Sequence, residues 1–414
     1  MLYKSNLGVN AVVIVNMLVM SSPVWAKNID KAPMSLSGTA SPTPWQRYED
    51  WPDKNHNKYS TLAIEASPPI GVIPDVALPI SGDANKGKEL AFDRERGGSC
   101  VACHVMGNDT PELPGNVGPD LSTIGSQRTD DVLFKYIYEP RHFNPATVMP
   151  PWGTNGLFSV DEIKDIVAFM KTLTTPAVFS DAKDDPASRA KPVEDRDNLD
   201  AVENPAMEAA EKGEALFSVK GPSGKSCASC HAKPDKSFKH WAAGMPTYSK
   251  KLRKVLGVEE FVTRHAKATT GQKYLMQSDE NIALSIYLRH LANGAPITVK
   301  ADTKEAKAAV ARGEALSKRK IGQLNFSCMD CHNAAANRWI RGQWLGESKG
   351  QTPHFPTWRT SRAEIWDIRK RFQWCNVAIR ANELPPDAPE YGDIELYLVL
   401  QNNGLPLSVP GIRH

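Results

Sequence analysis

Hydrophobic residues recur at helical spacing in three separate stretches of the chain, 161–173, 279–291 and 393–400. In the first stretch the apolar positions are Ile163, Ile166, Val167, Met170 and Leu173. Apolar residues three and four positions apart share one face of an α-helix, so each stretch predicts an amphipathic helix with one packed face.

Each of these helices closes a unit that begins in the same way. A shorter helical pattern opens at Gly87, Gly213 and Gly313, and a cysteine follows each glycine after 13, 14 and 15 residues, respectively. A pattern that returns in this way is typical of one structural unit used repeatedly. The sequence therefore predicts one fold that occurs three times.

Six of the seven cysteines lie in three C-x-x-C-H motifs, which end at His104, His231 and His332. Two thiols at this spacing can add to the two vinyl groups of a haem, while the adjacent histidine ligates the iron. The attachment residues are Cys100, Cys103, Cys227, Cys230, Cys328 and Cys331. The motifs predict three covalently bound haem c groups.

Two other interpretations of these cysteines are possible in principle. One motif alone could be a redox or zinc half-site, but three copies, each followed directly by histidine, argue against this. A disulfide framework has dispersed cysteines, whereas only Cys375 stands apart from the tight pairs here. Repeat and motifs together predict a mainly α protein of three domains, each resembling the class I cytochrome c fold.

Composition adds limits on the fold and on charge. The chain has 414 residues, of which 41% are hydrophobic and 23% charged, as in a soluble globular protein. The net charge is only +3, but acidic residues dominate 1–204 and basic residues dominate 205–414, the half expected to attract anions. The predicted domains are 82–175, 205–297 and 298–414.

The remaining segments differ from these domains in composition. Residues 1–26 combine Lys4, a short interrupted apolar run and a small-x-small pattern ending at Ala26, which predicts a signal peptide and a periplasmic protein. Residues 27–81 are rich in proline without periodicity, so we expect a largely extended or disordered leader. Residues 176–204 are acidic and contain prolines, as in a solvated linker.

The second axial ligand decides much of what a haem iron does. In the first domain Met106 lies too close to the haem motif, and Met170 belongs to the packed helix face. Met149 precedes two prolines in a loop, where class I cytochromes present a methionine, so we predict Met149 as the ligand. In the second domain the candidates are His240, Met245, His265 and His290, and residue type alone leaves Met245 and His265 open.

The third domain has no methionine after its haem motif, which leaves His354, Cys375 and His414 as candidate ligands. The pattern from Ser361 to Glu364 predicts a capping box that opens a helix running to Cys375. Arg371 lies one turn before Cys375 on the same face, and a nearby cation favours the thiolate, the better nucleophile and metal ligand. We therefore predict Cys375 as both iron ligand and reactive thiol.

These features resemble the SoxXA cytochromes of bacterial sulfur oxidation, with both subunits joined in one chain. Residues 82–176 resemble SoxX; the matching segments are Gly87–Asp93, Cys100–His104, Gly115–Pro119 and Thr147–Gly153. Residues 204–414 resemble dihaem SoxA; the matching segments are Phe326–His332, Trp339–Gln343, Arg371–Asn376, Asn403–Pro406 and Pro410–Arg413.

The resemblance implies an L-cysteine S-thiosulfotransferase. SoxXA joins thiosulfate oxidatively to the carrier cysteine of SoxYZ and passes two electrons to a small c-type cytochrome. In the family, the cysteine that matches Cys375 is a haem ligand carrying an extra sulfur as persulfide, and the arginine that matches Arg371 is a catalytic residue beside it. A guanidinium is suited to holding a sulfur oxyanion over that sulfur.

The chain departs from the family pattern in two respects. Dihaem SoxA commonly has a second cysteine where this chain has His265, so the resemblance favours His265 over Met245 as ligand of the second haem. SoxX and SoxA are also usually separate chains. Two other functions compete with this interpretation: an electron-transfer cytochrome, which has no use for a reactive thiol, and a thiosulfate dehydrogenase that forms tetrathionate.

Overall fold

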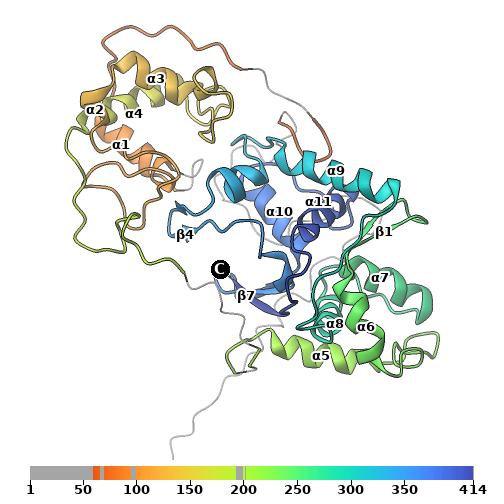
Figure 1. The fold of residues 1–414 in the computed structure, drawn as a ribbon. Coiled ribbons are helices and arrows are strands. Elements are labelled where there is room, and N and C mark those ends of the chain that lie inside the picture. Colours follow the sequence, from red (N-terminus) through yellow and green to blue (C-terminus); the bar gives the residue numbers. More distant parts are fainter. Residues whose placement is uncertain (1–58, 66–69, 95–98, 193–198, 201, 414) are drawn as a thin grey trace, which may run out of the picture. The chain divides into compact units, whose positions relative to one another are not determined.

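The computed structural model describes residues 59–65, 70–94, 99–192, 199–200 and 202–413 (Figure 1). The predicted signal peptide, residues 1–26, lies outside the described residues. Helices dominate the described part, which contains no helix long and apolar enough to cross a membrane. Three modules of similar construction follow one another along the chain.

The first module contains four α-helices. They are α1 (Ala84–Phe92), α2 (Ile124–Gln127), α3 (Asp130–Tyr138) and α4 (Val160–Thr172), with short 3-10 turns η2 (Cys100–Ala102) and η3 (Pro140–His142). Helix α4 begins where it does because Ser159 and Glu162 form a capping box: each side chain accepts the other residue's backbone N–H. The predicted helix over 161–173 is present within one residue at each end.

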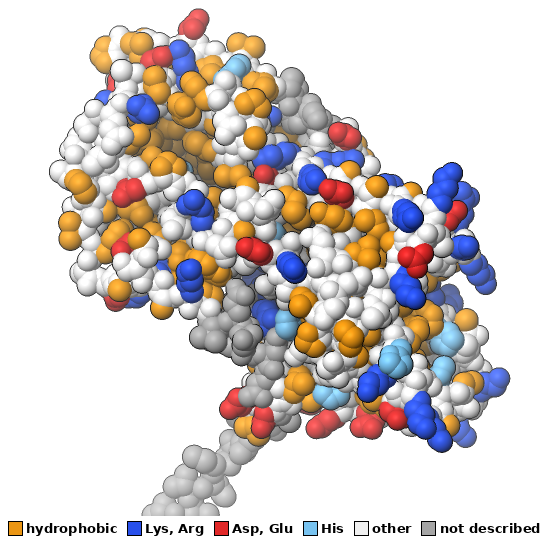
Figure 2. Space-filling model, viewed as in Figure 1, with side chains coloured by type: hydrophobic (Ala, Val, Ile, Leu, Met, Phe, Trp, Pro, Cys, Tyr) orange, Lys and Arg blue, Asp and Glu red, His pale blue; other side chains and the backbone are white. Residues whose placement is uncertain are grey.

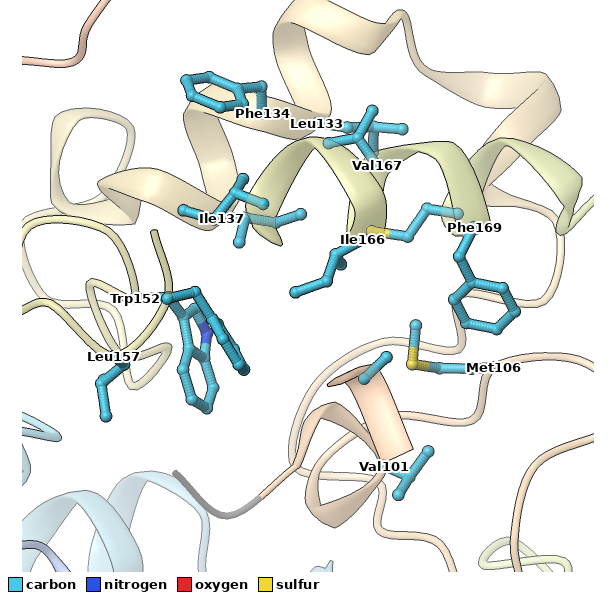
Figure 3. Packing of buried hydrophobic residues seen from close by; sticks show 14 of the residues in the cluster. Val101, Met106, Leu133, Phe134, Ile137, Trp152, Leu157, Ile166, Val167 and Phe169 are labelled. Carbon is cyan, nitrogen blue, oxygen red and sulfur yellow. The ribbon is translucent and has the colours of Figure 1, made fainter. Parts of the chain in front are cut away.

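The core of the first module lies between α3, α4 and the loop that carries Trp152 (Figure 3). Phe134, Ile166 and Met106 are at most 1% exposed in this cluster. Fully burying such a side chain contributes roughly 1.5–3 kcal/mol, so the cluster fixes the frame on which the first haem motif is held.

The second and third modules repeat the helix pair and add small sheets. The second contains α5 (Met207–Phe217), α6 (Pro234–Ala243), β1 (Thr247–Ser249), β2 (Lys254–Leu256), α7 (Val258–Thr269) and α8 (Asp279–His290). The third contains α9 (Lys304–Lys318), η4 (Asp330–Ala334), β3 (Trp339–Ile340), β4 (Gln343–Trp344), η5 (Thr352–His354), β5 (Thr357–Arg359), β6 (Glu364–Trp366), α10 (Ile368–Ala378), α11 (Pro389–Leu400) and β7 (Gly411–Arg413). Strand β5 pairs antiparallel with β6 and parallel with β7.

The three repeated glycines lie where the first helix of each module meets the last. A Cβ on Gly87 would stand 1.9 Å from the backbone oxygen of Asp165 in α4. A Cβ on Gly213 or Gly313 would stand 2.1 Å from a backbone oxygen in α8 or α11, respectively. No other residue allows so close a crossing. One helix crossing therefore occurs three times, as the repeat predicts.

The second and third modules also share a hairpin followed by a helix, at a constant sequence offset of 110 positions. Strands β1 and β5 begin at Thr247 and Thr357, and helices α7 and α10 begin at Val258 and Ile368. Helix α10 starts later than the capping-box pattern at 361–364 predicts, because Glu364 lies in β6 and Asp367 provides the N-cap. Positions in the two modules can thus be compared residue by residue.

A buried ion cluster joins the second module to the third. Arg369, at the start of α10, is 1% exposed; its Nη1 and Nε donate to Glu260 of α7 at 2.9 Å and to Glu395 of α11 at 2.8 Å. Lys254 also pairs with Glu260, at 2.9 Å. An unpaired buried charge destabilises the folded state, so removing one member of the cluster would destabilise the contact between the two modules.

The described parts of the leader and linker pack more closely than their composition predicts. Tyr59 and Leu62 are buried, and the Tyr59 hydroxyl donates to the backbone oxygen of Asn155 at 2.6 Å. Arg189, in the acidic linker, is 8% exposed and donates to the backbone oxygens of Pro114 and Arg341 at 3.0 Å each. Aromatic and arginine side chains embedded in a polar segment account for the difference, because they find partners on the folded modules.

Candidate functional site

The predicted sites of the first and third haems border one cavity of about 1600 Å³. Figure 2 shows a hollow lined by hydrophobic side chains on this face of the molecule. The predicted site residues in its lining are Cys100, Cys103, His104, Met149, Cys328, Cys331, His332, Arg371 and Cys375. Residues that lie far apart in the sequence thus meet around one space.

His104 is held in an orientation that suits an axial ligand. Its Nδ1 lies 2.7 Å from the backbone oxygen of Pro119, which leaves Nε2 as the ring nitrogen free for a metal. Gly118 lies against the ring, where a Cβ would come within 2.2 Å of an imidazole atom. Of the three methionine candidates, Met106 and Met170 are buried in the core, whereas Met149 is partly exposed on its loop.

Four of the six motif cysteines have surroundings that favour a neutral sulfur over a thiolate. All six motif cysteines are free of disulfides. Burial raises the pKa of Cys100, Cys103, Cys328 and Cys331 to about 12. A thioether has no ionisable proton, so attachment to haem suits these apolar positions, and the donor set fits haem c.

His265 and His231 approach each other in the second module. Their ring centroids are 6.3 Å apart, and the His265 ring stacks on Phe261 with centroids 5.1 Å apart. Two imidazoles that share one metal at about 2 Å from each ring nitrogen require a separation of this size. Burial lowers the pKa of His265, and His231 lowers it further, which favours the neutral ring that can ligate a metal.

The sequence offset of 110 makes His265 the counterpart of Cys375. Both residues occupy the eighth position of their helices, α7 and α10. The alternative, Met245, corresponds to Phe355 and is 3% exposed in the core of the second module. The fold therefore pairs His265, and not Met245, with the position of the predicted thiol ligand.

The third site has a similar frame around a different ligand. The Nδ1 of His332 lies 3.1 Å from the backbone oxygen of Gly346, again leaving Nε2 free. Cys375 lines the same cavity as Cys328 and Cys331, and burial together with Cys375 raises the pKa of these two thiols. Burial lowers the pKa of His332, and the positive charge of Arg371 lowers it further. His354 also lines the cavity, whereas His414 lies outside the described residues.

The first and third modules are in direct contact beside their haem motifs. The Arg341 backbone N–H, in the β3–β4 hairpin, donates to the backbone oxygen of Ala102 at 2.9 Å. The Asn116 backbone N–H donates to that of Trp339 at 2.9 Å. Ala102 lies inside the first C-x-x-C-H motif, so the two haem positions are held by one continuous frame.

Sequence reasoning missed one residue of this site, Arg359. It lines the cavity and is 8% exposed, at the end of β5. Its position is 16 residues before Cys375, where no helical spacing links the two. Comparison of the internal repeats could have found it. The corresponding residue of the second module is Ser249, so the arginine occurs in the third module and not in the second.

Two family models match parts of the chain. Residues 212–297 match the model described as SoxA/TsdA, cytochrome c domain, and residues 84–174 match that of cytochrome c. A relative from Chlorobaculum thiosulfatiphilum, "L-cysteine S-thiosulfotransferase subunit SoxA", is 32% identical over 206 residues, 49% of this chain and 70% of that protein. The chain belongs to the SoxA family.

Further comparisons agree with SoxA membership. The SoxA subunit of Pseudaminobacter salicylatoxidans is 29% identical over 216 residues, 52% of this chain and 75% of that protein. The crystal structure of SoxXA from P. pantotrophus has a TM-score of 0.50 and 28% identity, covering 54% of this chain and 84% of that one. The chain is a c-type cytochrome of the SoxA class of L-cysteine S-thiosulfotransferases.

Proposed function

We propose that this SoxA-family chain binds three haem c groups, in domains 82–175, 205–297 and 298–414. The support is the occurrence of one glycine helix crossing and one C-x-x-C-H motif in each module. His104, His231 and His332 would hold the three irons from one side. Met149, His265 and Cys375 would hold them from the other.

We further propose that the protein couples thiosulfate to the cysteine of a SoxYZ carrier in the periplasm. The carrier thiol R–SH and S₂O₃²⁻ form R–S–S–SO₃⁻, with loss of one proton and two electrons. One S–S bond forms, no S–S or S–O bond of thiosulfate breaks, and a small c-type cytochrome accepts the electrons. The observation that carries the proposal is Cys375 and Arg371 in a cavity shared with two haem motifs.

The chain's own residues have distinct tasks in this reaction. The haems, when bound, supply sites that accept and pass single electrons. Cys375 offers a sulfur inside the cavity, and Arg371, one turn earlier on α10, binds the sulfonate oxygens and neutralises charge as the S–S bond forms. Contact of the β3–β4 hairpin with Ala102 favours an electron path from the third haem to the first.

Analysis of sulfur products with and without the carrier tests this function. The holoprotein, thiosulfate and an oxidised c-type cytochrome are expected to give the S-thiosulfonated carrier, seen as a mass increase on its cysteine. Rapid formation of tetrathionate without the carrier would instead identify a thiosulfate dehydrogenase. Failure to form either product would leave an electron-transfer cytochrome.

His265→Ala is expected to change the absorption spectrum of the second haem alone, because its iron loses the ligand opposite His231. Met245→Ala serves as the matched control, since Met245 lies in the apolar core of the same module. Low-temperature spectra or electron paramagnetic resonance would separate the three haems. A changed second haem in Met245→Ala with an unchanged spectrum in His265→Ala would contradict the ligand assignment.

A further inference from the structure

We propose that Arg359 is a second substrate-binding residue, which together with Arg371 holds the sulfonate oxygens of thiosulfate next to the Cys375 sulfur. The inference rests on the proposed function and specifies which part of the cavity recognises the substrate. Thiosulfate is a dianion, so two guanidinium groups match its charge, and each can donate two parallel hydrogen bonds to sulfonate oxygens.

Arg359 is a buried cation with no acidic partner among the residues that the structure describes. It is 8% exposed, and its Nε has no hydrogen-bond acceptor. The ion pairs of the described chain do not include it; instead its guanidinium carbon lies 5.6 Å from the centroid of the Trp366 ring. Because an unpaired buried charge is costly, such a group indicates a ligand of opposite charge.

The surroundings of Arg359 are positively charged and include the reactive thiol. Burial, together with the positive charge of Arg371, lowers the pKa of Arg359 to about 9, whereas Cys375 acts in the opposite direction. The cavity lining contains arginines but no aspartate or glutamate among the described residues. An anion bound here would relieve the repulsion between the two guanidinium groups.

Comparison of the two related modules indicates whether Arg359 and Arg371 bind a substrate or the haem propionates. At the sequence offset of 110, Arg359 corresponds to Ser249 and Arg371 corresponds to Phe261. The second haem would carry the same two propionates as the third, yet its module has neither arginine at these positions. Both arginines occur only in the module that has a cysteine in place of His265. Their presence therefore follows the thiol rather than the haem.

Thiosulfate binding to the oxidised holoprotein, measured by isothermal titration calorimetry without carrier or electron acceptor, tests the inference. Arg359→Ser introduces the residue that the second module carries in the same strand position. We expect it to raise the Kd for thiosulfate by about 10- to 100-fold, the usual effect of losing a hydrogen bond to a charged group. Arg359→Lys should lose less, because it keeps the charge but not the planar pair of donors.

Lys307→Ser is the matched control, since it removes one positive charge from an exposed position of α9 in the same module and should leave the Kd unchanged. An unchanged Kd in Arg359→Ser would overturn the inference. If the Kd is unchanged and the midpoint potential of the third haem shifts, Arg359 binds a haem propionate instead of the substrate, which also overturns the inference. A wild-type protein that binds no thiosulfate would also overturn it.

Two further outcomes remain informative. If Arg359→Ser fails to retain its haems, Arg359→Lys decides: a raised Kd with an unaltered haem spectrum supports the inference, and an unaltered Kd overturns it. If thiosulfate binds with the expected dependence on Arg359 but no carrier product forms, the anion site stands and the proposed coupling function fails.

Discussion

Cys375→Met is expected to abolish the coupling of thiosulfate to the carrier while all three haems remain attached. A thioether is an acceptable axial ligand, so a protein that only relayed electrons through the third haem would keep much of its turnover. A thioether has no thiolate form and cannot carry an additional sulfur as a persulfide. Product formation should therefore fall below detection, as measured by mass spectrometry of the carrier cysteine.

His265→Met provides the control for this result, because it makes the same kind of ligand change at the corresponding position of the second module. It should alter the second haem while leaving substantial coupling activity. Pyridine haemochrome absorbance should give three haems per chain in both variants. Full coupling activity in Cys375→Met would assign the chemistry to another residue and leave this module as an electron carrier.

Arg371→Ala is expected to reduce the rate of coupling by about 10²- to 10³-fold, the usual effect of removing one electrostatic contact to charge that develops during reaction. The haem spectra should change little, because Cys375 and His332 remain in place. Steady-state kinetics with varied thiosulfate should show a lower kcat as well as a higher KM.

Lys307→Ala controls for the loss of one positive charge from the same module, and its kinetics should match those of the wild type. A loss in Arg371→Ala of less than about threefold would remove this residue from the reaction. A raised KM with unchanged kcat would mean that Arg371 contributes to substrate binding alone.

The sequence could predict the parts of this protein that depend on local pattern. Hydrophobic periodicity located α4 and α8, because this signal lies within a single helix. The C-x-x-C-H motifs likewise predict the haem-attachment residues from a few neighbouring positions. The predicted start of α10, at the pattern 361–364, lies several residues before the observed start at Ile368. The pattern at 361–364 resembles a capping box, but the chain there forms β6, whose pairing with β5 competes successfully with helix formation.

Contacts between distant segments could not be predicted in this way. Met245 and His265 are both acceptable ligands, and only the fold shows that one is buried in the core and the other faces His231. Arg359 gave no local signal, because a single arginine in a short strand resembles any surface residue, and only comparison with Ser249 of the second module distinguishes it. The acidic composition around Arg189 likewise gave no indication that this residue packs against the folded modules.

The ion cluster between the second and third modules makes two similarly built units complementary in charge. At the offset of 110, Arg369 and Lys370 of α10 correspond to Glu259 and Glu260 of α7, so charges of opposite sign occupy equivalent positions. A symmetric dimer of either module would bring like charges together in its buried interface. Each module therefore carries the charges that the other needs, and pairing through this interface requires one of each.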